Sequence, residues 1–544
     1  MPTFAGSLRW LFIKLPTLGR FVRWLFSWRS VRAALFALLA CATLVILFYG
    51  VENWRGRYAW KKYRADAERR GANFEFKTFL PPQVPDEQNF AMTPLLRPMF
   101  DYVPNSHPII WRDTNGWNRV AAISAYGRRG FDGVAKVGDW MHGQRTDLEI
   151  WQRLYRNEPQ AETNSSARGS GGARGNSKRT KQPTQLRPED TFPTAAERQS
   201  PAADVLLALT KFDAVMTELQ AAVRRPHSRF PIHYDEDYFT LLPHLAKLKA
   251  FSQMFQLRAV AHLAQTNQEA AFADLETQFR LADSLKDELF LISQAVRNGL
   301  IQSALHTVWE GAVDHRWTAP QLERVQRRLA AFDMPAEFIR PFQAERSFHL
   351  LGMEHGLQNR AKLSQLFDML PGRDQPTAFS LFVRYAPSGW FYQNEIAFNR
   401  RVDQATEGIE KAKVGGVFVP LSFPPSDPGK IYEVLLSLFP GEVMTNLLNQ
   451  FPRVQTQVKL AEVGCALERF HLAHQAYPQT LAELTPQFIA RLPNDFMDGQ
   501  PLRYRRLSEH GFKLYSIGLN LKDDDGTFPS KDNAATGDWM WEIR

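Results

Sequence analysis

The run AALFALLACATLVILFYGV occupies residues 33–51 and contains no charged side chain. At about 1.5 Å of rise per residue, a helix over this run is about 28 Å long, close to the ~30 Å hydrocarbon core of a bilayer. Arg32 precedes the run, and Tyr49, Trp54 and Arg55 mark its far end, as at a membrane interface. The run therefore predicts one transmembrane helix. A buried core helix and a cleaved signal peptide are the alternatives, but no small-x-small cleavage site follows the run.

The flanks of this run are both basic. Residues 1–32 hold six Arg and Lys residues and no acid, interleaved with Trp, Phe and Leu. This composition suits a basic amphipathic arm on the membrane surface, and the alternative is a disordered basic arm. Residues 52–70 carry seven Lys and Arg residues, so the positive-inside rule does not decide the orientation. We expect the N-terminus in the cytoplasm, because a short arm is easier to retain there.

The net charge of +9 over 544 residues is concentrated in two segments. Residues 1–32 and 163–188 each carry six basic residues and no acid; without those twelve, 54 of the 66 Lys and Arg residues remain against 57 Asp and Glu. A basic face for nucleic acid is therefore not expected on the folded part. Of the two cysteines, Cys41 lies inside the apolar run and Cys465 lies far along the chain. The sequence therefore suggests neither a disulfide between them nor a zinc site that depends on cysteine.

The chain beyond the membrane run is predicted to be mainly helical. Residues 52–157 read as a juxtamembrane helix, a proline-rich strap and a small mixed region, and residues 158–201 read as a disordered linker poor in large apolar side chains. Residues 202–450 form a helical domain, in which apolar side chains recur at steps of three and four. The helices of 202–330 are typical of either a tetratricopeptide-like pair or a plain bundle, and we expect them to bind a protein partner.

The pattern changes again over residues 451–544. An amphipathic helix ends at Tyr477–Pro478, and the stretches 502–505 and 512–517 alternate as strands do, with a turn between them. The sequence therefore predicts a small α+β domain at the C-terminus, built from one helix and an antiparallel sheet.

This C-terminal order resembles the globular domain of type II secretion pseudopilins, the major pseudopilin in particular. The residues that carry the resemblance follow the family's order of motifs: Tyr477, Pro478, Leu481, Leu492, Pro493, Asp495, Gly499, Tyr504, Tyr515, Ser516, Gly518, Gly526 and Asp538. The resemblance implies a bacterial inner-membrane protein with its bulk in the periplasm. Two departures are large: some 400 residues separate residue 51 from residue 451, and no leader-peptidase site precedes residue 33. The whole layout resembles long bacterial envelope proteins that carry such tails.

In the family, the acidic loop before the last strand binds calcium. The matching residues here are Asp523, Asp524, Asp525 and Asp538, and several carboxylates with backbone carbonyls on one irregular loop suit Ca²⁺. An EF-hand register fails, because it places Leu521 at the first ligand position. The alternative is a solvated acidic turn.

Motifs for common catalytic chemistries are absent from the sequence: there is no GxxxxGK[ST], HExxH or GxSxG. His471 and His474 lie three apart on a helix, and we expect them to be surface histidines rather than ligands. The sequence thus favours a non-enzymatic envelope scaffold that is linked to type II secretion or to a pilus-like assembly. A periplasmic hydrolase whose site forms only in three dimensions and a calcium-dependent assembly subunit are the alternatives.

Overall fold

The structure is a computed structural model of the full chain. It describes residues 27–103, 106, 108–131, 138–158, 191–234, 240–361, 363–364, 378–423, 441–529 and 536–544. Most of the predicted arm and most of the predicted linker lie outside these residues. The chain divides into two compact units: unit 1 comprises 1–72, 353–400 and 426–438, and unit 2 comprises 73–352, 401–425 and 439–544.

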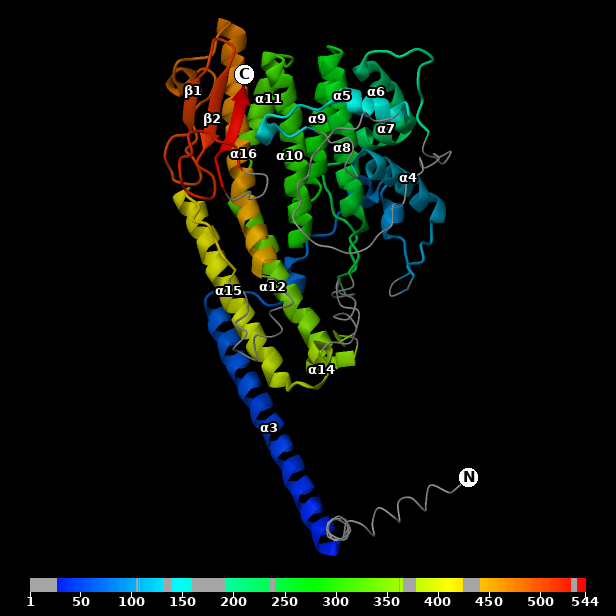
Figure 1. The fold of residues 1–544 in the computed structure, drawn as a ribbon, viewed down its shortest axis with the longest axis vertical. Coiled ribbons are helices and arrows are strands. Elements are labelled where there is room, and N and C mark those ends of the chain that lie inside the picture. Colours follow the sequence, from blue (N-terminus) through cyan, green and yellow to red (C-terminus); the bar gives the residue numbers. More distant parts are fainter. Residues whose placement is uncertain are drawn as a thin grey trace, which may run out of the picture. The chain divides into compact units, whose positions relative to one another are not determined.

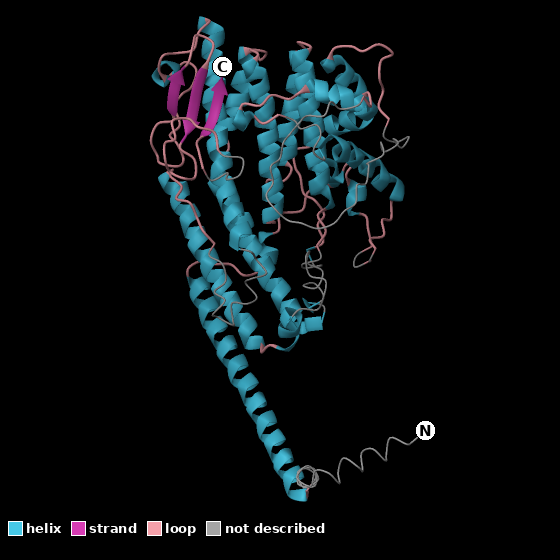
Figure 2. Ribbon diagram, in the orientation of Figure 1, coloured by secondary structure: helices cyan, strands magenta, loops and turns pink. Residues whose placement is uncertain are grey.

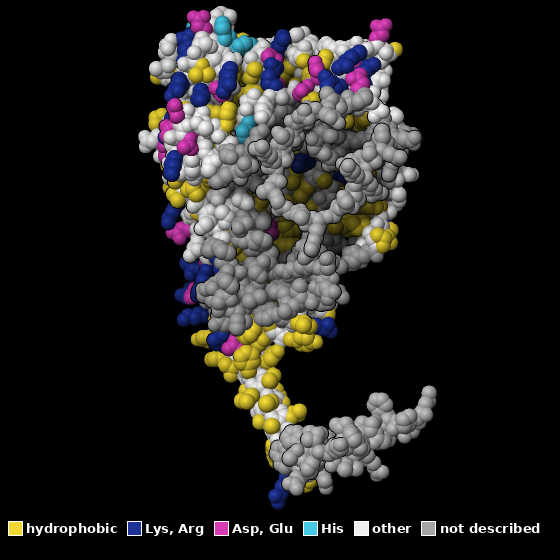
Figure 3. All heavy atoms as spheres, in the orientation of Figure 1, with side chains coloured by type: hydrophobic (Ala, Val, Ile, Leu, Met, Phe, Trp, Pro, Cys, Tyr) yellow, Lys and Arg dark blue, Asp and Glu magenta, His cyan; other side chains and the backbone are white. Residues whose placement is uncertain are grey.

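Helix α3 (Trp28–Arg69) dominates unit 1. It begins at Ser27, whose hydroxyl accepts a hydrogen bond from the backbone N–H of Ser30, and it continues for 42 residues. The apolar run and the polar helix that follows it are therefore one uninterrupted helix. Among the described residues, α3 is the one helix that is long and apolar enough to cross a membrane, and the side chains of its apolar part are exposed (Figure 3).

Unit 1 is held together by a close helix crossing. Gly56 of α3 lies against Gly389 near the start of α15, and a Cβ on either glycine would collide with the opposite backbone. The side-chain oxygen of Asn53 accepts a hydrogen bond from the backbone N–H of Gly389 at 3.0 Å, so a residue of α3 caps the first turn of α15. The indole of Trp390 donates to Glu52 at 2.9 Å. Helix α14 (Ala378–Tyr385) lies wholly in unit 1, whereas α15 (Ser388–Gly415) belongs to it up to residue 400 and α12 (Met334–Gln358) from residue 353.

Unit 2 is built around helices α8, α9 and α10, which pack on one another (Figure 1). Asn267 forms the turn between α8 and α9, and its side chain caps α9 by accepting from the N–H of Ala270. The predicted helices of 202–330 are thus confirmed; their tetratricopeptide-like character stays a prediction. From residue 114 to residue 313, the helices of unit 2 are α4 (Thr114–Phe131), α5 (Leu148–Tyr155), α6 (Pro201–Leu209), α7 (Asp213–Ala222), α8 (Pro243–Ala264), α9 (Gln268–Asp283) and α10 (Leu291–Val313).

Three further helices complete the helical part: α11 (Ala319–Ala330), α12 (Met334–Gln358) and α16 (Gly441–His474). Thr318 and Gln321 form a capping box that fixes the start of α11. Helix α16 is 34 residues long, includes Pro452, and packs against α10, α11 and the sheet. It therefore runs straight across the boundary drawn at 450–451, and the residues on both sides of that boundary belong to unit 2.

The C-terminal sheet has three antiparallel strands in the order β1 (Arg503–Arg506), β2 (Phe512–Ser516) and β3 (Trp539–Ile543) (Figure 2). Leu514 is the central partner, opposite Tyr504 on one side and Trp541 on the other. The indole of Trp541 packs against Gly464 of α16, where a Cβ would leave it no room. The predicted antiparallel sheet is confirmed.

The proline-rich strap of 73–101 forms short 3-10 helices at Phe76–Phe79, Asp86–Gln88, Phe90–Met92 and Arg97–Phe100. Further short turns of this kind lie at Trp140–His142, Thr210–Phe212 and Leu481–Leu484. The tryptophans of the mixed region do not gather in one cluster. Trp111 stacks on Trp117 with ring centroids 3.8 Å apart, whereas Trp140 contacts Trp541 of the sheet.

Candidate functional site

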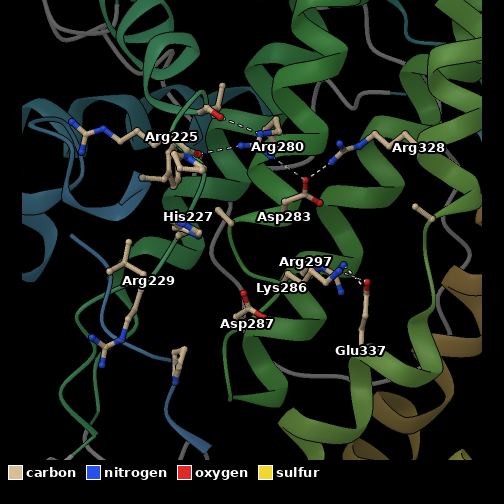
Figure 4. A pocket seen from close by; sticks show the side chains of 18 of the residues that line it. Arg225, His227, Arg229, Arg280, Asp283, Lys286, Asp287, Arg297, Arg328 and Glu337 are labelled. Carbon is tan, nitrogen blue, oxygen red and sulfur yellow. Dashed lines mark hydrogen bonds and ion pairs between the residues drawn. The ribbon is translucent and has the colours of Figure 1, made fainter. Parts of the chain in front are cut away.

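A basic pocket in unit 2 is the leading candidate for a binding site. It has a volume of about 610 Å³, within the range of about 300–1,000 Å³ typical of ligand pockets. The end of α9, the turn before α10, the end of α11 and the start of α12 surround it, together with residues of the strap and of the segment after α7 (Figure 4).

One wall of the pocket is a rigid pairing between the strap and residues 223–229. The backbone of His227 accepts from the N–H of Phe90 at 2.8 Å and donates to the carbonyl of Gln88 at 3.2 Å. The Asn89 side chain binds both backbone groups of Arg229, with N···O distances of 2.8 Å for each bond. These bonds explain how a proline-rich segment without regular structure keeps a fixed position.

Arginine side chains fasten this wall to the helices. Arg225 donates to the carbonyls of Asp86 at 2.8 Å and Asn89 at 2.9 Å. Arg280 of α9 donates to the carbonyls of Val223 at 3.0 Å and Arg225 at 3.1 Å. Since these carbonyls are neutral, the two guanidinium charges are hydrogen-bonded but only weakly neutralised.

The charges that line the pocket are unequal. Three carboxylates face seven Lys and Arg side chains. The acids are Asp283, Asp287 and Glu337, and the bases are Arg225, Arg229, Arg280, Lys286, Arg297, Arg327 and Arg328. A pocket with this excess, and with walls that exclude part of the solvent, raises the local concentration of anions.

Two of the acids are already shared between cations. Glu337 lies 2.6 Å from Arg297 and 2.8 Å from Lys286, measured between nitrogen and oxygen atoms. Asp283 pairs with Arg328, and its Oδ2 atom also lies 3.9 Å from Nη1 of Arg280. Arg229 has no acidic partner among the residues that the structure describes. The positive excess is therefore not removed by pairing within the pocket.

Arg297 gives the clearest sign of a missing acceptor. Its side chain is 1 % exposed, and one guanidinium nitrogen binds Glu337. Its Nε and Nη1 atoms are buried without a hydrogen-bond acceptor in the described part of the chain. A buried donor left without a partner costs about 1–3 kcal/mol, and more when it is charged. An anionic ligand in the pocket would supply the acceptor.

The acidic loop proposed for calcium has a different arrangement. Asp538 is fully buried, and its carboxylate accepts from the backbone N–H of Gly526 at 2.7 Å and of Asp524 at 3.1 Å. Burial, together with the charges of Asp523 and Asp524, raises the pKa of Asp538. This residue fastens the loop to the start of β3.

The other three aspartates point to separate partners. The Asp524 carboxylate accepts from the Asn520 amide at 2.7 Å, and Asp525 accepts from Arg505 at 2.6 Å. Asp523 accepts from the backbone N–H of Asp525 at 3.0 Å. The structure thus brings the loop and Asp538 together, and calcium binding there stays a prediction.

The two histidines expected on the surface differ from each other. His474 is exposed, as predicted, but His471 is 5 % exposed, and the prediction for it was wrong. The reason is tertiary: the end of α10 and the turn before β2 cover this side of α16, where His471 contacts His315 and His510.

Sequence reasoning missed the basic pocket because its residues come from segments that are spread between residues 81 and 337. The signals in the sequence were the Arg-rich stretches around 224–229 and 327–328, but a charge balance over the whole folded part averages them away. In a comparison with known proteins, no family model, no curated protein and no solved structure matches this chain.

Proposed function

We propose that this chain is a membrane-anchored, non-enzymatic interaction protein of the bacterial envelope, whose basic pocket receives an acidic segment of a partner protein. The observation that carries the proposal is the buried guanidinium of Arg297, with two donor atoms that no described acceptor satisfies, in a pocket where cations outnumber acids. The pocket lies in the helical region predicted to bind a partner.

The layout supports a role in which unit 2 binds a partner protein and α3 keeps the chain at the membrane. Helix α3 would serve as the anchor, with the N-terminus in the cytoplasm and the bulk of the chain in the periplasm. The support for this orientation is the C-terminal resemblance to pseudopilins and the short basic arm. The same resemblance supports a link to type II secretion or to a pilus-like assembly. In such an assembly, the pocket would bind acidic segments of partner proteins.

The test uses the full chain in detergent and a fluorescein-labelled hexaglutamate peptide, followed by fluorescence anisotropy. Hexalysine and a neutral peptide of equal length serve as controls. We expect saturable binding of hexaglutamate only. The binding should weaken when ionic strength rises from about 0.1 M to about 1 M, where the Debye length falls from ~10 Å to ~3 Å.

The decisive variant is Arg229→Gln, because Arg229 has no acidic partner among the described residues and its removal leaves no carboxylate stranded. We expect a loss of affinity of about tenfold or more, since a hydrogen bond to a charged group contributes ~1.5–3 kcal/mol. Arg324→Gln is the matched control: Arg324 lies on α11, is exposed, and does not line the pocket.

Two results would reject the proposal. Equal losses in Arg229→Gln and Arg324→Gln would show that hexaglutamate binds the general surface. Binding of pyrophosphate without binding of hexaglutamate would identify the ligand as a small phosphorylated molecule instead of a protein segment.

A further inference from the structure

A second group of polar side chains, outside the basic pocket, converges from three segments of unit 2. His315 follows the end of α10, Glu468 and His471 lie one turn apart on α16, and His510 lies in the turn before β2. Because residues i and i+3 share a helix face, Glu468 and His471 point to the same side. His315 has a φ of +50°, a left-handed conformation that is uncommon for a residue other than glycine.

The contacts within this histidine–glutamate cluster are short. His315 Nδ1 lies 2.7 Å from Glu468 Oε1, and the hydroxyl of Tyr477 donates to Glu468 Oε2 at 2.7 Å. His471 Nε2 lies 3.0 Å from His510 Nδ1. One potential ligand atom each from His315, Glu468 and His471 lies within 4.8 Å of the others.

Burial makes this cluster unlike a chance gathering of surface histidines. Glu468 is fully buried and His471 is 5 % exposed. The Nδ1 atom of His471 is buried without a hydrogen-bond partner among the described residues. A buried carboxylate is costly unless a positive charge compensates it. Glu468 meets the phenol of Tyr477 and the imidazole of His315, and its hydrogen bond raises the pKa of His315, so a proton on His315 can supply that charge.

We propose that His315, Glu468 and His471 bind a divalent transition-metal ion of the zinc class. Imidazole nitrogens and one carboxylate are the donor set that zinc, cobalt and nickel accept, whereas calcium requires six to eight oxygens. The ion would take the place of the proton that His315 shares with Glu468, and it would fix the end of α10 against helix α16.

Coordination requires one movement. The rings of His315 and His471 stack with centroids 4.3 Å apart and planes 14° apart, so a metal in the plane of one ring lies outside the plane of the other. The His315 side chain is 31 % exposed, and coordination requires its ring to rotate about the Cβ–Cγ bond. Its nitrogen then approaches the position that Glu468 and His471 share, and tetrahedral zinc would bring the ligand atoms to about 3.3 Å from one another.

The experiment uses the full chain in detergent, purified with a tag that lacks histidine, stripped with a chelator and titrated with Co²⁺. We expect visible absorption bands of tetrahedral cobalt that saturate at a single equivalent and disappear when Zn²⁺ is added. We expect Zn²⁺ to raise the thermal unfolding temperature of the stripped protein as well, since it binds the folded state.

Two variants test the ligands, and one serves as the control. Glu468→Gln and His315→Ala should each weaken Co²⁺ binding by more than about 100-fold, because loss of an outer-sphere partner alone costs ~10–100-fold. His474→Ala should bind Co²⁺ as the wild type does, since His474 is exposed and one turn away from the cluster. Thermal unfolding of each metal-free variant shows whether it is folded. If Glu468→Gln is unfolded, His315→Ala decides, because its side chain is partly exposed.

Three outcomes would overturn the proposal. They are the absence of saturable Co²⁺ binding to the wild type, unchanged binding in folded His315→Ala, and loss of binding in His474→Ala.

Discussion

Helices α3 and α10 are both long enough to cross a bilayer, yet their surroundings differ: α3 has an exposed apolar run, whereas α10 is mostly buried in protein. The 23 residues of α10 span about 34 Å, and 16 of them are buried in protein. The run of residues 33–51 in α3 is exposed along its length. Length alone therefore does not separate a membrane helix from a core helix.

The difference lies in the polar side chains and their partners. Helix α10 buries a set of polar residues: Ser293, Gln294, Arg297, Asn298, His306, Thr307 and Glu310. Several of them bind neighbouring segments; Gln294, for example, donates to the carbonyls of Leu285 and Glu288. In the apolar run of α3, the hydroxyl of Thr43 donates to the carbonyl of Leu39 in its own helix. A helix in protein can use outside partners, whereas a helix in lipid must satisfy itself.

The largest expected effect comes from placing two charges in the apolar run of α3. The double variant Leu39→Arg, Leu44→Arg should lose membrane association, because each arginine at the centre of a spanning helix costs about 2.5–3.5 kcal/mol. Flotation of membranes after an alkaline wash measures this. The control carries Leu39→Phe and Leu44→Phe and should float with the membranes. Retention of the arginine variant in the membrane fraction would contradict α3 as the anchor.

Next in size is Glu310→Ala in α10. The carboxylate of Glu310 accepts from the backbone N–H of Thr146 at 2.6 Å and lies 3.0 Å from His306 Nε2. Removal of one partner from a buried charged network costs about 3–5 kcal/mol. Urea unfolding of the full chain measures the loss. Glu323→Ala, which removes an exposed carboxylate of α11, should change stability by less than about 0.5 kcal/mol. Similar losses in both variants would refute the burial argument.

Two glycines of α10 provide a smaller, internally controlled test. A Cβ on Gly311 would collide with the buried indole of Trp317, whereas a Cβ on Gly299 would meet open space. Gly311→Ala should therefore destabilise unit 2 by about 1–3 kcal/mol through overpacking. Gly299→Ala should stabilise it by about 0.5–1 kcal/mol through helix propensity. Thermal unfolding of the two variants should move in opposite directions, and a shift in the same direction would contradict the packing of α10.

The smallest expected effect compares one threonine in each helix. Thr307 donates to the buried side chain of Gln278 on α9 at 3.1 Å, so Thr307→Val removes a bond between helices. We expect a loss of about 0.5–1.5 kcal/mol. Thr43→Val removes only a bond within α3 and should change stability by less than about 0.5 kcal/mol. A larger loss in Thr43→Val, measured by unfolding in detergent, would show that α3 has a protein partner at this position.

Much of the helical fold was open to prediction from residue periodicity. The helices of 202–330 lie where apolar residues recur every three to four positions. The strands near 502 and 512 lie where apolar and polar residues alternate. Several residues chosen as motif positions also contact one another: Asp495 accepts from the hydroxyl of Ser516 at 2.7 Å, and Tyr504 donates to the carbonyl of Pro478 at 2.7 Å. The spacing of such residues in the sequence is informative, because the geometry of the nearby chain determines which groups they contact.

The rest depends on tertiary packing. The change of pattern at residues 450–451 suggested a boundary, but α16 continues through it as one helix that packs against α10, α11 and the sheet. The basic pocket unites Arg225, Arg297 and Arg328 from different elements, and neither periodicity nor total charge reports that meeting. His471 appeared to be a surface residue for the same reason, since no local pattern shows which helix face another segment will cover.

Helix α3 has no break between its apolar run and the polar part that follows, so the two parts must move together. A spanning helix responds to a bilayer that is thinner or thicker than its apolar run by tilting, at a cost of fractions of a kcal/mol per Å of mismatch. In a broken helix, the junction would absorb that tilt. If α3 tilts in a bilayer, the part of the helix beyond residue 51 tilts with it. That part includes Gly56, about 8 Å further along the axis, where the backbone of α3 contacts the backbone of Gly389. Membrane thickness would thereby become a mechanical input to the crossing that holds unit 1 together.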